Sequence, residues 1–287
     1  MAWRPSDTQY RLYEKKRIEE LRKVYLRSQN NLIGILNSVD LTSFQRYRTE
    51  QLLSQVNQEI VRLNKAVTRW SLINVRPSYR QGVGFASDKL KQLKVVRGVD
   101  SSALIHRQAV SVLIDDVAKD LLIVNGVIKK NVQRYIRSTQ QKIIQDRAIS
   151  GMLAEGLIQG EARRTVSDKL LNELRSKMTD GQMITIGGRN YRPDKYAELV
   201  ARTRLREATT QGTVNTSLQY GNDLIQISIH EDIDGDDICN QYEGKVYSIS
   251  GTDPDYPVAD VLPPFHPNCR HVVVPITREA IEKRGLK

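Results

Sequence analysis

The segment His266-Pro-Asn-Cys-Arg-His-Val-Val-Val-Pro275 is the most informative stretch for the fold of the C-terminal part of the chain. It holds two histidines and one cysteine within six positions, in a chain that has two cysteines and four histidines. Its second half, His271–Pro275, has the β-branched composition of a short strand. We therefore expect a ligand-rich turn that leads directly into a strand.

The second cysteine, Cys239, lies upstream in the segment Asp236–Tyr247, and we expect the two segments to form one compact site. Zinc takes four nitrogen or sulfur ligands in a tetrahedron, and a His-x-x-Cys turn can supply two of them. The candidate metal ligands are Cys239, His266, Cys269 and His271. Cys239 has no Cys-x-x-Cys partner because position 236 is aspartate, so Asp236 or His271 would complete the set.

Two alternatives to zinc remain open for these residues. In the first, no cofactor is bound, both cysteines are small buried residues, and His266 caps a turn. In the second, Cys239 and Cys269 form a disulfide. Zinc is thus a possible cofactor, and we expect no other.

The acidic run before Cys239 offers a calcium interpretation, because Asp232, Asp234, Asp236 and Glu243 have the spacing of calcium-loop ligands. Asp237 replaces the required glycine, which favours a solvated acidic loop. A catalytic Cys–His pair could be drawn from Cys269 and a nearby histidine. The close spacing suits ligation better, so we expect no enzyme.

Composition narrows the class of protein. The 287 residues can bury a sizeable core, and one or two domains are expected. We expect no membrane span, because no long apolar run occurs, and no secretory signal, because the N-terminus lacks an apolar region. Two cysteines fit a reducing compartment.

The net charge of +11 is unevenly distributed. Residues 1–150 hold 27 lysines and arginines against 13 acids, whereas residues 223–265 hold one lysine against ten acids. A cationic N-terminal half indicates a polyanion or an acidic protein surface as a neighbour. The alternative is the solvated helical surface of a basic protein.

Residues 1–150 read as long helices, because apolar residues recur every three to four positions after Ser6, after Thr42 and from Ser102 to about Ile149. We expect Pro77, Gly82 and Gly84 to break this pattern, with residues 76–100 forming a loop with at most one short helix. The polar faces of these helices could bind DNA phosphates, but no pattern in them indicates recognition of specific bases.

Residues 151–287 change character. The sequence predicts helices over residues 161–178 and from Pro193 to about Tyr220. It also predicts a small hairpin over residues 183–191, built on a Gly-Gly turn. Three short strands are expected over residues 225–229, 245–249 and 271–275, with a loop over 250–264. The predicted fold is mainly α, with an extended helical region (1–150) and a small α+β module (151–287) that contains short antiparallel strands.

Three pieces of this module resemble the phage Mu F-like head morphogenesis family, the minor head proteins of tailed bacteriophages. They are a helix with Leu199-Val-Ala-Arg-Thr203, then Asp236-x-x-Cys239 leading to Gly244-Lys-Val-Tyr247, and then Pro264-Phe-His-Pro-Asn-Cys-Arg270. Family members commonly carry Cys-x-x-Cys in the second piece and Cys-Arg-Cys in the third. Here Asp236 and His271 replace two of those cysteines, and a histidine in place of cysteine keeps the capacity to bind metal.

The resemblance implies a virion protein in the interior of the phage head, present in multiple copies and assembled in the host bacterial cytoplasm. It implies the portal protein as a partner and contact with double-stranded DNA that is independent of sequence. Scaffold or major capsid protein are further possible partners, and roles in genome packaging or ejection follow. The rival interpretation is a small zinc- or thiol-dependent enzyme, such as a nuclease or a delivered toxin domain.

Overall fold

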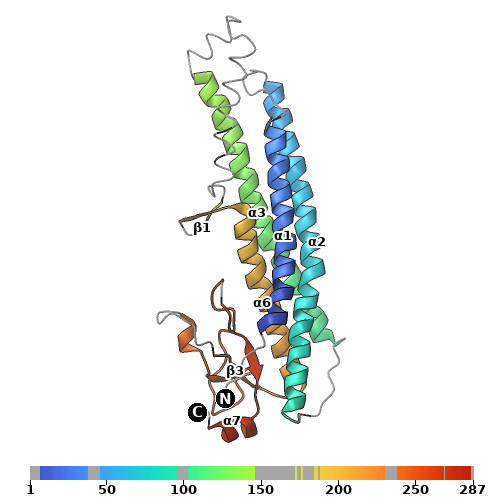
Figure 1. Cartoon of the computed structure of the whole chain (residues 1–287), viewed down its shortest axis with the longest axis vertical. Helices are drawn as coiled ribbons and strands as arrows, with labels where there is room; N and C mark the ends of the chain where they lie inside the picture. Colours follow the sequence, from blue (N-terminus) through green and yellow to red (C-terminus); the bar gives the residue numbers. More distant parts are fainter. Residues whose placement is uncertain are drawn as a thin grey trace, which may run out of the picture. The chain divides into compact units, whose positions relative to one another are not determined.

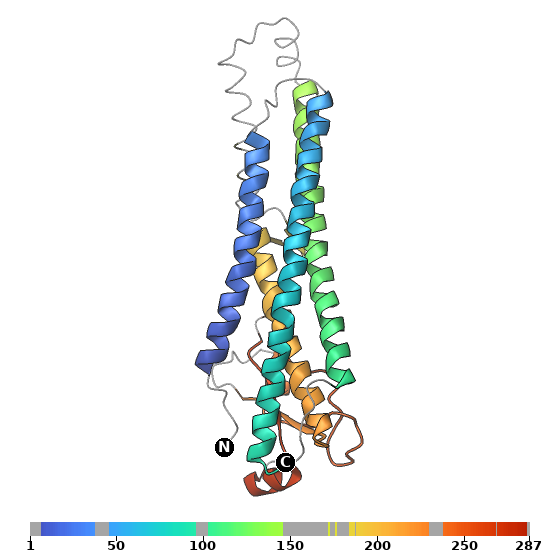
Figure 2. The ribbon, with the colours of Figure 1, turned by 90° about the vertical axis from the view of Figure 1, so that its right-hand side faces the viewer.

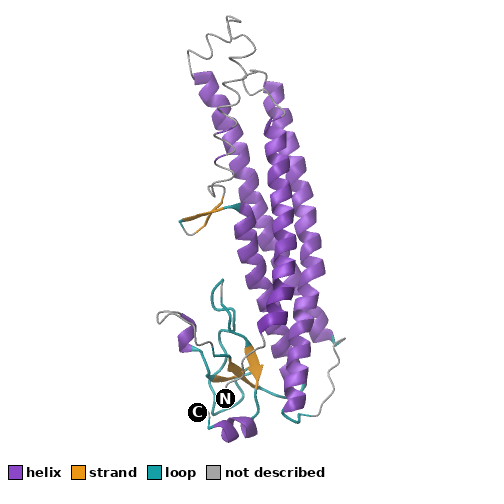
Figure 3. Cartoon of the chain, in the orientation of Figure 1, coloured by secondary structure: helices purple, strands orange, loops and turns teal. Residues whose placement is uncertain are grey.

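A computed structural model describes residues 7–37, 46–95, 103–145, 172, 176, 184–186, 188–229, 238–267 and 269–285. Helices dominate this part of the chain, and the strands are short (Figure 3). The expected fold class, mainly α with short antiparallel strands near the C-terminus, is confirmed. In chain order the elements are α1 (Asp7–Asn37), α2 (Arg46–Gln92), α3 (Leu104–Gln145), β1 (Ile184–Ile186), β2 (Arg189–Tyr191), α6 (Pro193–Gln219), β3 (Leu224–Ile227), a 3₁₀ turn η1 (Ile238–Gln241), β4 (Val246–Ser248), β5 (Val273–Pro275) and α7 (Arg278–Arg284).

Some sequence predictions fall outside the described residues. Most of the helix expected over 161–178, the calcium-like run from Asp232 to Asp237 and the proposed boundary at residue 150 belong to this group. The division into 1–150 and 151–287 therefore stays a prediction.

The three long helices bury residues at an eleven-residue period. An eleven-residue repeat gives about 3.67 residues per turn, close to the 3.6 of a straight helix, so the buried stripe stays on one side over many turns. The repeat shows in pairs of fully or almost fully buried side chains: Leu21 with Leu32, Tyr25 with Leu36, Leu52 with Leu63, Val56 with Val67, Leu121 with Val132, and Val117 with Ile128. The helical spacing read from the sequence is confirmed here. Leu104 and Val112 also follow the apolar spacing predicted from Ser102 onward, but their expected burial is wrong, because each is 59% exposed.

The predicted break at Pro77, Gly82 and Gly84 is wrong, because α2 continues through all three residues. A proline inside a helix costs about 3 kcal/mol. Buried contacts on either side of Pro77 oppose this cost: the Trp70 indole donates to the Arg17 carbonyl (3.0 Å), and Arg17 donates to the Ser78 hydroxyl (2.5 Å). The sequence pattern contains the local penalty but not these contacts.

The chain forms two compact units, each built from several segments. The sheet unit comprises Met1–Glu19, Trp70–Ala118 and Leu199–Lys287, and the hairpin unit comprises Glu20–Arg69 and Lys119–Glu198. Each unit therefore contains stretches of α1, α2, α3 and α6. Figures 1 and 2 show the stretches of α1, α2 and α3 in the hairpin unit lying side by side. Among the described helices, none has the length and hydropathy needed to cross a bilayer.

In the hairpin unit, α6 begins at a buried carboxylate. Asp194 is fully buried and accepts hydrogen bonds from Arg22 (3.3 Å) and Arg192 (3.1 Å). Polar pairs also join the long helices, because Asn125 donates to Asn64 (2.8 Å) and the Tyr25 hydroxyl donates to the Leu121 carbonyl (3.5 Å). The predicted hairpin is confirmed: β1 and β2 pair antiparallel, with Ile184 opposite Tyr191.

In the sheet unit, α2 and α6 approach so closely that only glycine fits at the contact. A Cβ on Gly82 would lie 1.9 Å from the Thr209 carbonyl oxygen, and one on Gly212 would lie 2.2 Å from the Tyr79 carbonyl oxygen. Thr209 donates to the Ser78 carbonyl (3.0 Å) across the same contact. The contact fixes α6, the helix that supports the C-terminal sheet, against α2.

Side-chain hydrogen bonds extend this contact. The Tyr79 hydroxyl is 2.7 Å from His106 Nδ1 and accepts from Asn215 (2.8 Å), and His106 Nε2 is 2.9 Å from Gln219 Oε1. The His106 side chain is only 3% exposed and links α2, α3 and α6.

The C-terminal sheet has the order β4-β3-β5 and is antiparallel throughout. The three predicted strands are confirmed, with ends that differ by at most two residues. Val214, Ile225, Ile227 and Val273 form a core between α6 and the sheet. Helix α7, which the sequence reading missed, begins at Thr277, whose side chain accepts from the Ala280 amide.

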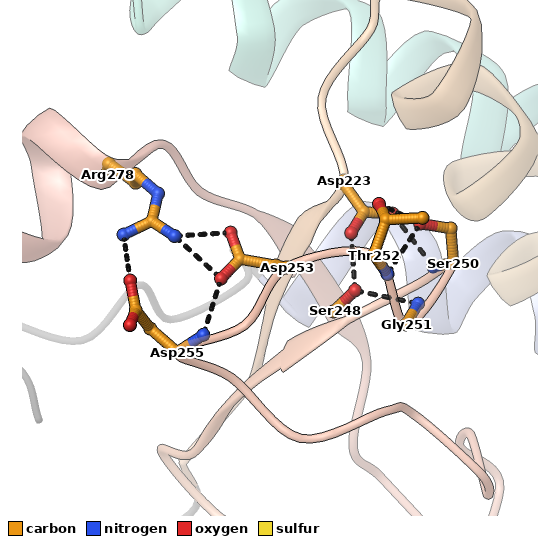
Figure 4. Close-up of polar contacts among 8 residues, drawn as sticks. All are labelled: Asp223, Ser248, Ser250, Gly251, Thr252, Asp253, Asp255 and Arg278. Atoms are coloured by element: carbon orange, nitrogen blue, oxygen red, sulfur yellow. Dashed lines mark hydrogen bonds and ion pairs between the residues drawn. The ribbon is translucent and has the colours of Figure 1, made fainter.

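The predicted loop over 250–264 is held by polar contacts at its start (Figure 4). Arg278 on α7 binds Asp253 and Asp255, each at 2.7 Å. Asp223, just before β3, accepts from the Ser250 amide (2.8 Å) and from the Ser248 hydroxyl. Burial raises the pKa of Asp223, but these hydrogen bonds outweigh it and hold the pKa below its ordinary value.

Candidate metal centre

Both cysteines of the chain come together in the sheet unit. Cys239 lies in the 3₁₀ turn η1, Cys269 lies in the loop before β5, and their sulfur atoms are 3.8 Å apart. Both are fully buried, and neither forms a disulfide. A disulfide requires about 2.05 Å between the sulfurs. The disulfide alternative is therefore absent from this structure.

His266 lies near both cysteines, at the start of a tight turn that ends at Cys269. The Cys269 amide donates to the His266 carbonyl (2.9 Å), which closes the His-x-x-Cys turn expected from the sequence. Donor atoms of Cys239, His266 and Cys269 all lie within 4.8 Å of one another. Three of the four predicted ligands thus converge as one cluster, from positions 30 residues apart in the chain.

His271, the fourth predicted ligand, contacts this cluster through Cys269. Its Nδ1 atom is 3.5 Å from the Cys269 sulfur, and its Nε2 atom is 2.5 Å from a Glu243 carboxylate oxygen. A metal-binding histidine typically donates its second ring N–H to a carboxylate, which fixes the ring orientation. The structure therefore brings all four predicted residues together and adds Glu243 as an outer partner.

The electrostatics of Cys269 and His271 are linked. Burial by itself raises the pKa of the Cys269 thiol, but its hydrogen bonds with His271 and with backbone groups outweigh burial and lower the pKa. Burial by itself lowers the pKa of His271, but its hydrogen bonds with Cys269 and Glu243 raise it above the ordinary value. The thiolate form of Cys269 and the protonated form of His271 therefore stabilise each other.

Two aromatic side chains lie next to His271. The Phe265 ring stacks on Tyr242, with centroids 4.3 Å apart and planes 12° apart, and lies 6.1 Å from the His271 ring. Both cysteines are fully buried beneath the surface. The cluster offers the sulfur and nitrogen donors that bind a small cation such as zinc.

Helix α6 holds the ligand turn in position. Arg206 donates to the Cys269 carbonyl and forms an ion pair with Glu14 of α1 (2.9 Å). One turn earlier, Thr203 donates to the Pro267 carbonyl (3.4 Å). The Ala-Arg-Thr helix and the His-Pro-Asn-Cys segment, read separately in the sequence, therefore meet in space.

The remaining motif piece is the turn into β4. Gly244 has a positive φ of 70°, and its amide donates to the Ile227 carbonyl (3.0 Å). Gln226 on β3 donates to the Gly244 carbonyl (2.8 Å). Glycine is favoured here because its φ lies in the left-handed region, so the Gly-Lys-Val segment is a structural turn that leads Glu243 toward His271.

A comparison with models of protein families identifies the family of this chain. A family model described as phage minor capsid protein 2 matches residues 86–282, which is more than half of the chain. The chain belongs to this family. Searches of curated proteins and of solved structures gave no match.

Membership makes this minor capsid protein a component of the phage virion. The match covers α3, α6 and the whole C-terminal sheet, together with all four candidate ligands. The sequence-based expectation of a phage minor head protein is confirmed at this level. The narrower resemblance to the Mu F-like family is not tested by the match and stays a prediction.

Several functional contacts could not be found from the sequence. Glu243 had a signal, because it was noted as the last position of a calcium-like loop, but its partner proves to be His271. Arg206 and the Phe265–Tyr242 pair carried no distinguishing spacing. Asp236, the alternative fourth ligand, lies outside the described residues.

Proposed function

We propose that this minor capsid protein acts in head morphogenesis at the portal vertex, inside the phage head. In this role it binds the portal protein and contacts the packaged DNA without reading its sequence. The protein is a structural component in this proposal and not an enzyme. Family membership and the charge of the hairpin unit are the observations that support it.

The described surface of the hairpin unit is strongly cationic. Its exposed acids are Glu20 and Glu50, whereas its exposed bases are Lys23, Arg27, Arg62, Lys65, Arg69, Lys119, Lys130, Arg134, Arg137, Arg189 and Lys195. Dense DNA presents closely spaced phosphates, and lysine and arginine contacts to them release counterions. This surface supports the DNA part of the proposal more directly than the total charge does.

The bases are arranged on single helix faces. Lys130, Arg134 and Arg137 of α3 have the spacing i, i+4, i+7, so they lie on one face along two turns, about 10 Å. Arg62, Lys65 and Arg69 of α2 follow the related spacing i, i+3, i+7. A straight row of cations on a rigid helix can follow a phosphate backbone whatever the base sequence.

The DNA contact is tested by the salt dependence of binding. Purified full-length protein should bind two unrelated duplexes with equal affinity, measured by fluorescence anisotropy over a range of salt concentrations. The triple variant Lys130→Gln/Arg134→Gln/Arg137→Gln should reduce the slope of log K against log salt by about 3. Its matched control is Lys245→Gln/Arg270→Gln/Lys283→Gln, which removes three exposed cations of the C-terminal sheet region.

Equal slopes for the two triple variants would refute the assignment of DNA contact to α3. A marked preference for one duplex would refute sequence-independent contact. Because both variants change the net charge equally, a general charge effect cannot produce the expected difference.

The portal contact is supported by apolar side chains exposed on the sheet unit. Leu72 and Ile73 of α2 are 55% and 56% exposed, and Leu104 and Val112 of α3 are each 59% exposed. Large apolar side chains that are exposed on one unit are candidates for a protein-binding surface. Leu72 also lines a groove of about 590 Å³ between α2 and α3, together with Arg76, Tyr79, Arg80, Arg107 and Val110.

The portal contact is tested with Ile73→Asp. We expect this variant to fold normally but to lose co-purification with the portal protein of the same phage and to be missing from assembled particles. Val261→Asp is the control, because Val261 is 53% exposed in the loop of the C-terminal sheet region. Normal incorporation of Ile73→Asp would show that this face is not the portal contact.

A further inference from the structure

We propose that Cys239, His266, Cys269 and His271 bind one zinc ion, which acts as a structural centre of the sheet unit. The proposal does not rest on portal or DNA binding, and it concerns folding of the C-terminal sheet region. In this proposal both cysteines of the chain and two of its four histidines are zinc ligands.

Two of the distances between donor atoms agree with tetrahedral coordination. With Zn–S bonds of about 2.3 Å and Zn–N bonds of about 2.0–2.1 Å, two sulfur ligands lie about 3.8 Å apart, and a sulfur and a nitrogen about 3.5 Å apart. The two sulfurs are 3.8 Å apart, and Cys269 Sγ is 3.5 Å from His271 Nδ1. Two thiols in van der Waals contact would show a similar separation, so the further donors carry the argument.

Those further donors come from separate segments. Cys239 belongs to η1, His266 and Cys269 to one turn, and His271 to the approach to β5. His266 lies within the same 4.8 Å cluster as both sulfurs. His271 is outside that set, so completing the tetrahedron requires a small movement of its ring toward the cluster.

The orientation of His271 is the second independent observation. Its Nδ1 faces the cluster, and its Nε2 is hydrogen-bonded to Glu243, as expected for an imidazole that binds metal through one nitrogen and a carboxylate through the other. This pairing fixes the tautomer in which Nδ1 is free of its proton and can coordinate.

Charge and burial favour a closed structural site. Zinc with two thiolates and two neutral imidazoles has no net charge, so the complex can be buried without an unpaired ion. Binding releases the two thiol protons to solvent. Cys239 and Cys269 are fully buried and His271 is 3% exposed, which suits four protein ligands better than three ligands and a substrate position.

The centre would link three segments that have little core of their own. The cluster on one side of the sheet contains Leu224, Val246, Ile276 and Ile281, and the other contains four residues from α6, β3 and β5. Small cores are commonly strengthened by a metal. We therefore expect zinc to raise the stability of the sheet unit.

The test uses untagged full-length protein purified from cells grown with zinc. We expect one zinc ion per chain by mass spectrometry, and a thermal midpoint that falls with chelator and returns when zinc is added. Cobalt in place of zinc should give the visible absorption of a tetrahedral site with thiolate ligands. Protein that holds no stoichiometric metal and whose midpoint ignores the chelator would overturn the proposal.

Variants separate loss of a ligand from loss of folding. Cys239→Ser and Cys269→Ser should lose zinc, and Glu243→Gln should keep it with affinity about 10–100-fold lower. His106→Ala is the matched control, because it removes a buried histidine outside the cluster and should retain zinc although it is destabilised. Zinc loss in His106→Ala equal to that in Cys269→Ser, or full retention in His271→Ala, would contradict the four-ligand assignment.

Discussion

The contact between α2 and α6 makes a sharp prediction for Gly82→Ala. The added methyl group would lie 1.9 Å from the Thr209 carbonyl oxygen, and real Cβ contacts essentially never fall under 3.0 Å. The two helix backbones must therefore separate locally by more than about 1 Å, a displacement that strains a packed interface. No side-chain rotation can relieve the clash, since the obstacle is backbone.

The expected cost follows from three contributions. Overpacking of this kind costs about 1–3 kcal/mol. Separation weakens the hydrogen bonds from Thr209 to Ser78 and from Thr213 to Gly82, each contributing about 1 kcal/mol. Replacing glycine by alanine within a helix returns about 1 kcal/mol. The net loss of unfolding free energy should be about 2–4 kcal/mol.

Gly84→Ala is the matched control, because Gly84 lies two residues further along the same helix and a Cβ there meets nothing within 4 Å. It should be more stable than the wild type by about 0.5–1 kcal/mol. Urea unfolding of the full-length protein, followed by circular dichroism, measures both variants. If Gly82→Ala proves as stable as Gly84→Ala, the close approach of α2 and α6 is wrong.

Three further predictions concern polar contacts in the sheet unit. Tyr79→Phe removes a hydroxyl that pairs with His106 and should lower the unfolding free energy by about 1–3 kcal/mol. An unchanged unfolding free energy would show that the hydrogen bonds of Tyr79 do not stabilise the fold. Arg206→Lys keeps the charge but loses the bidentate pairing with Glu14. The free energy of unfolding, measured by thermal unfolding, should fall by about 1–2 kcal/mol. Wild-type stability would argue against the pairing. Asp223→Asn should cost about 1 kcal/mol at neutral pH. Because the folded pKa of Asp223 is lowered, its contribution is present above the unfolded pKa of about 3.9 and is lost as pH falls through the folded value, so the stabilities of variant and wild type should converge in acid. An unchanged difference at low pH would contradict this assignment.

The packing of α6 against α2 makes single substitutions preferable to truncation of residues 1–150. Gly212 and Thr209 of α6 contact α2 in the sheet unit, so removal of residues 1–150 would expose the face on which α6 packs. Single substitutions in the full-length chain are therefore more informative than truncation for separating DNA contact, portal contact and metal binding.

Local patterns in the sequence were sufficient for much of the fold. The spacing of residues such as Leu21, Tyr25 and Leu32 predicts a helical face because a buried stripe must recur at the helix period, and all three are buried. Alternation and β-branched composition predict β3, β4 and β5 because side chains of a strand point to opposite faces. The four candidate ligands were recognisable because cysteine and histidine are rare in this chain.

Other features depend on residues far apart in the chain, and the tertiary structure alone revealed them. Pro77 and Gly82 each carry a local penalty for a helix, and a sequence pattern contains that penalty without the compensating partners. The compensation comes from Arg17 and Thr209, which are distant in sequence. In the same way, the sequence predicted that Cys239 would join the turn of His266 and Cys269, but the pairing of Glu243 with His271 was revealed only by the tertiary structure. Local periodicity is a property of neighbouring residues, whereas closure of a site depends on contacts that form only when the whole chain has folded.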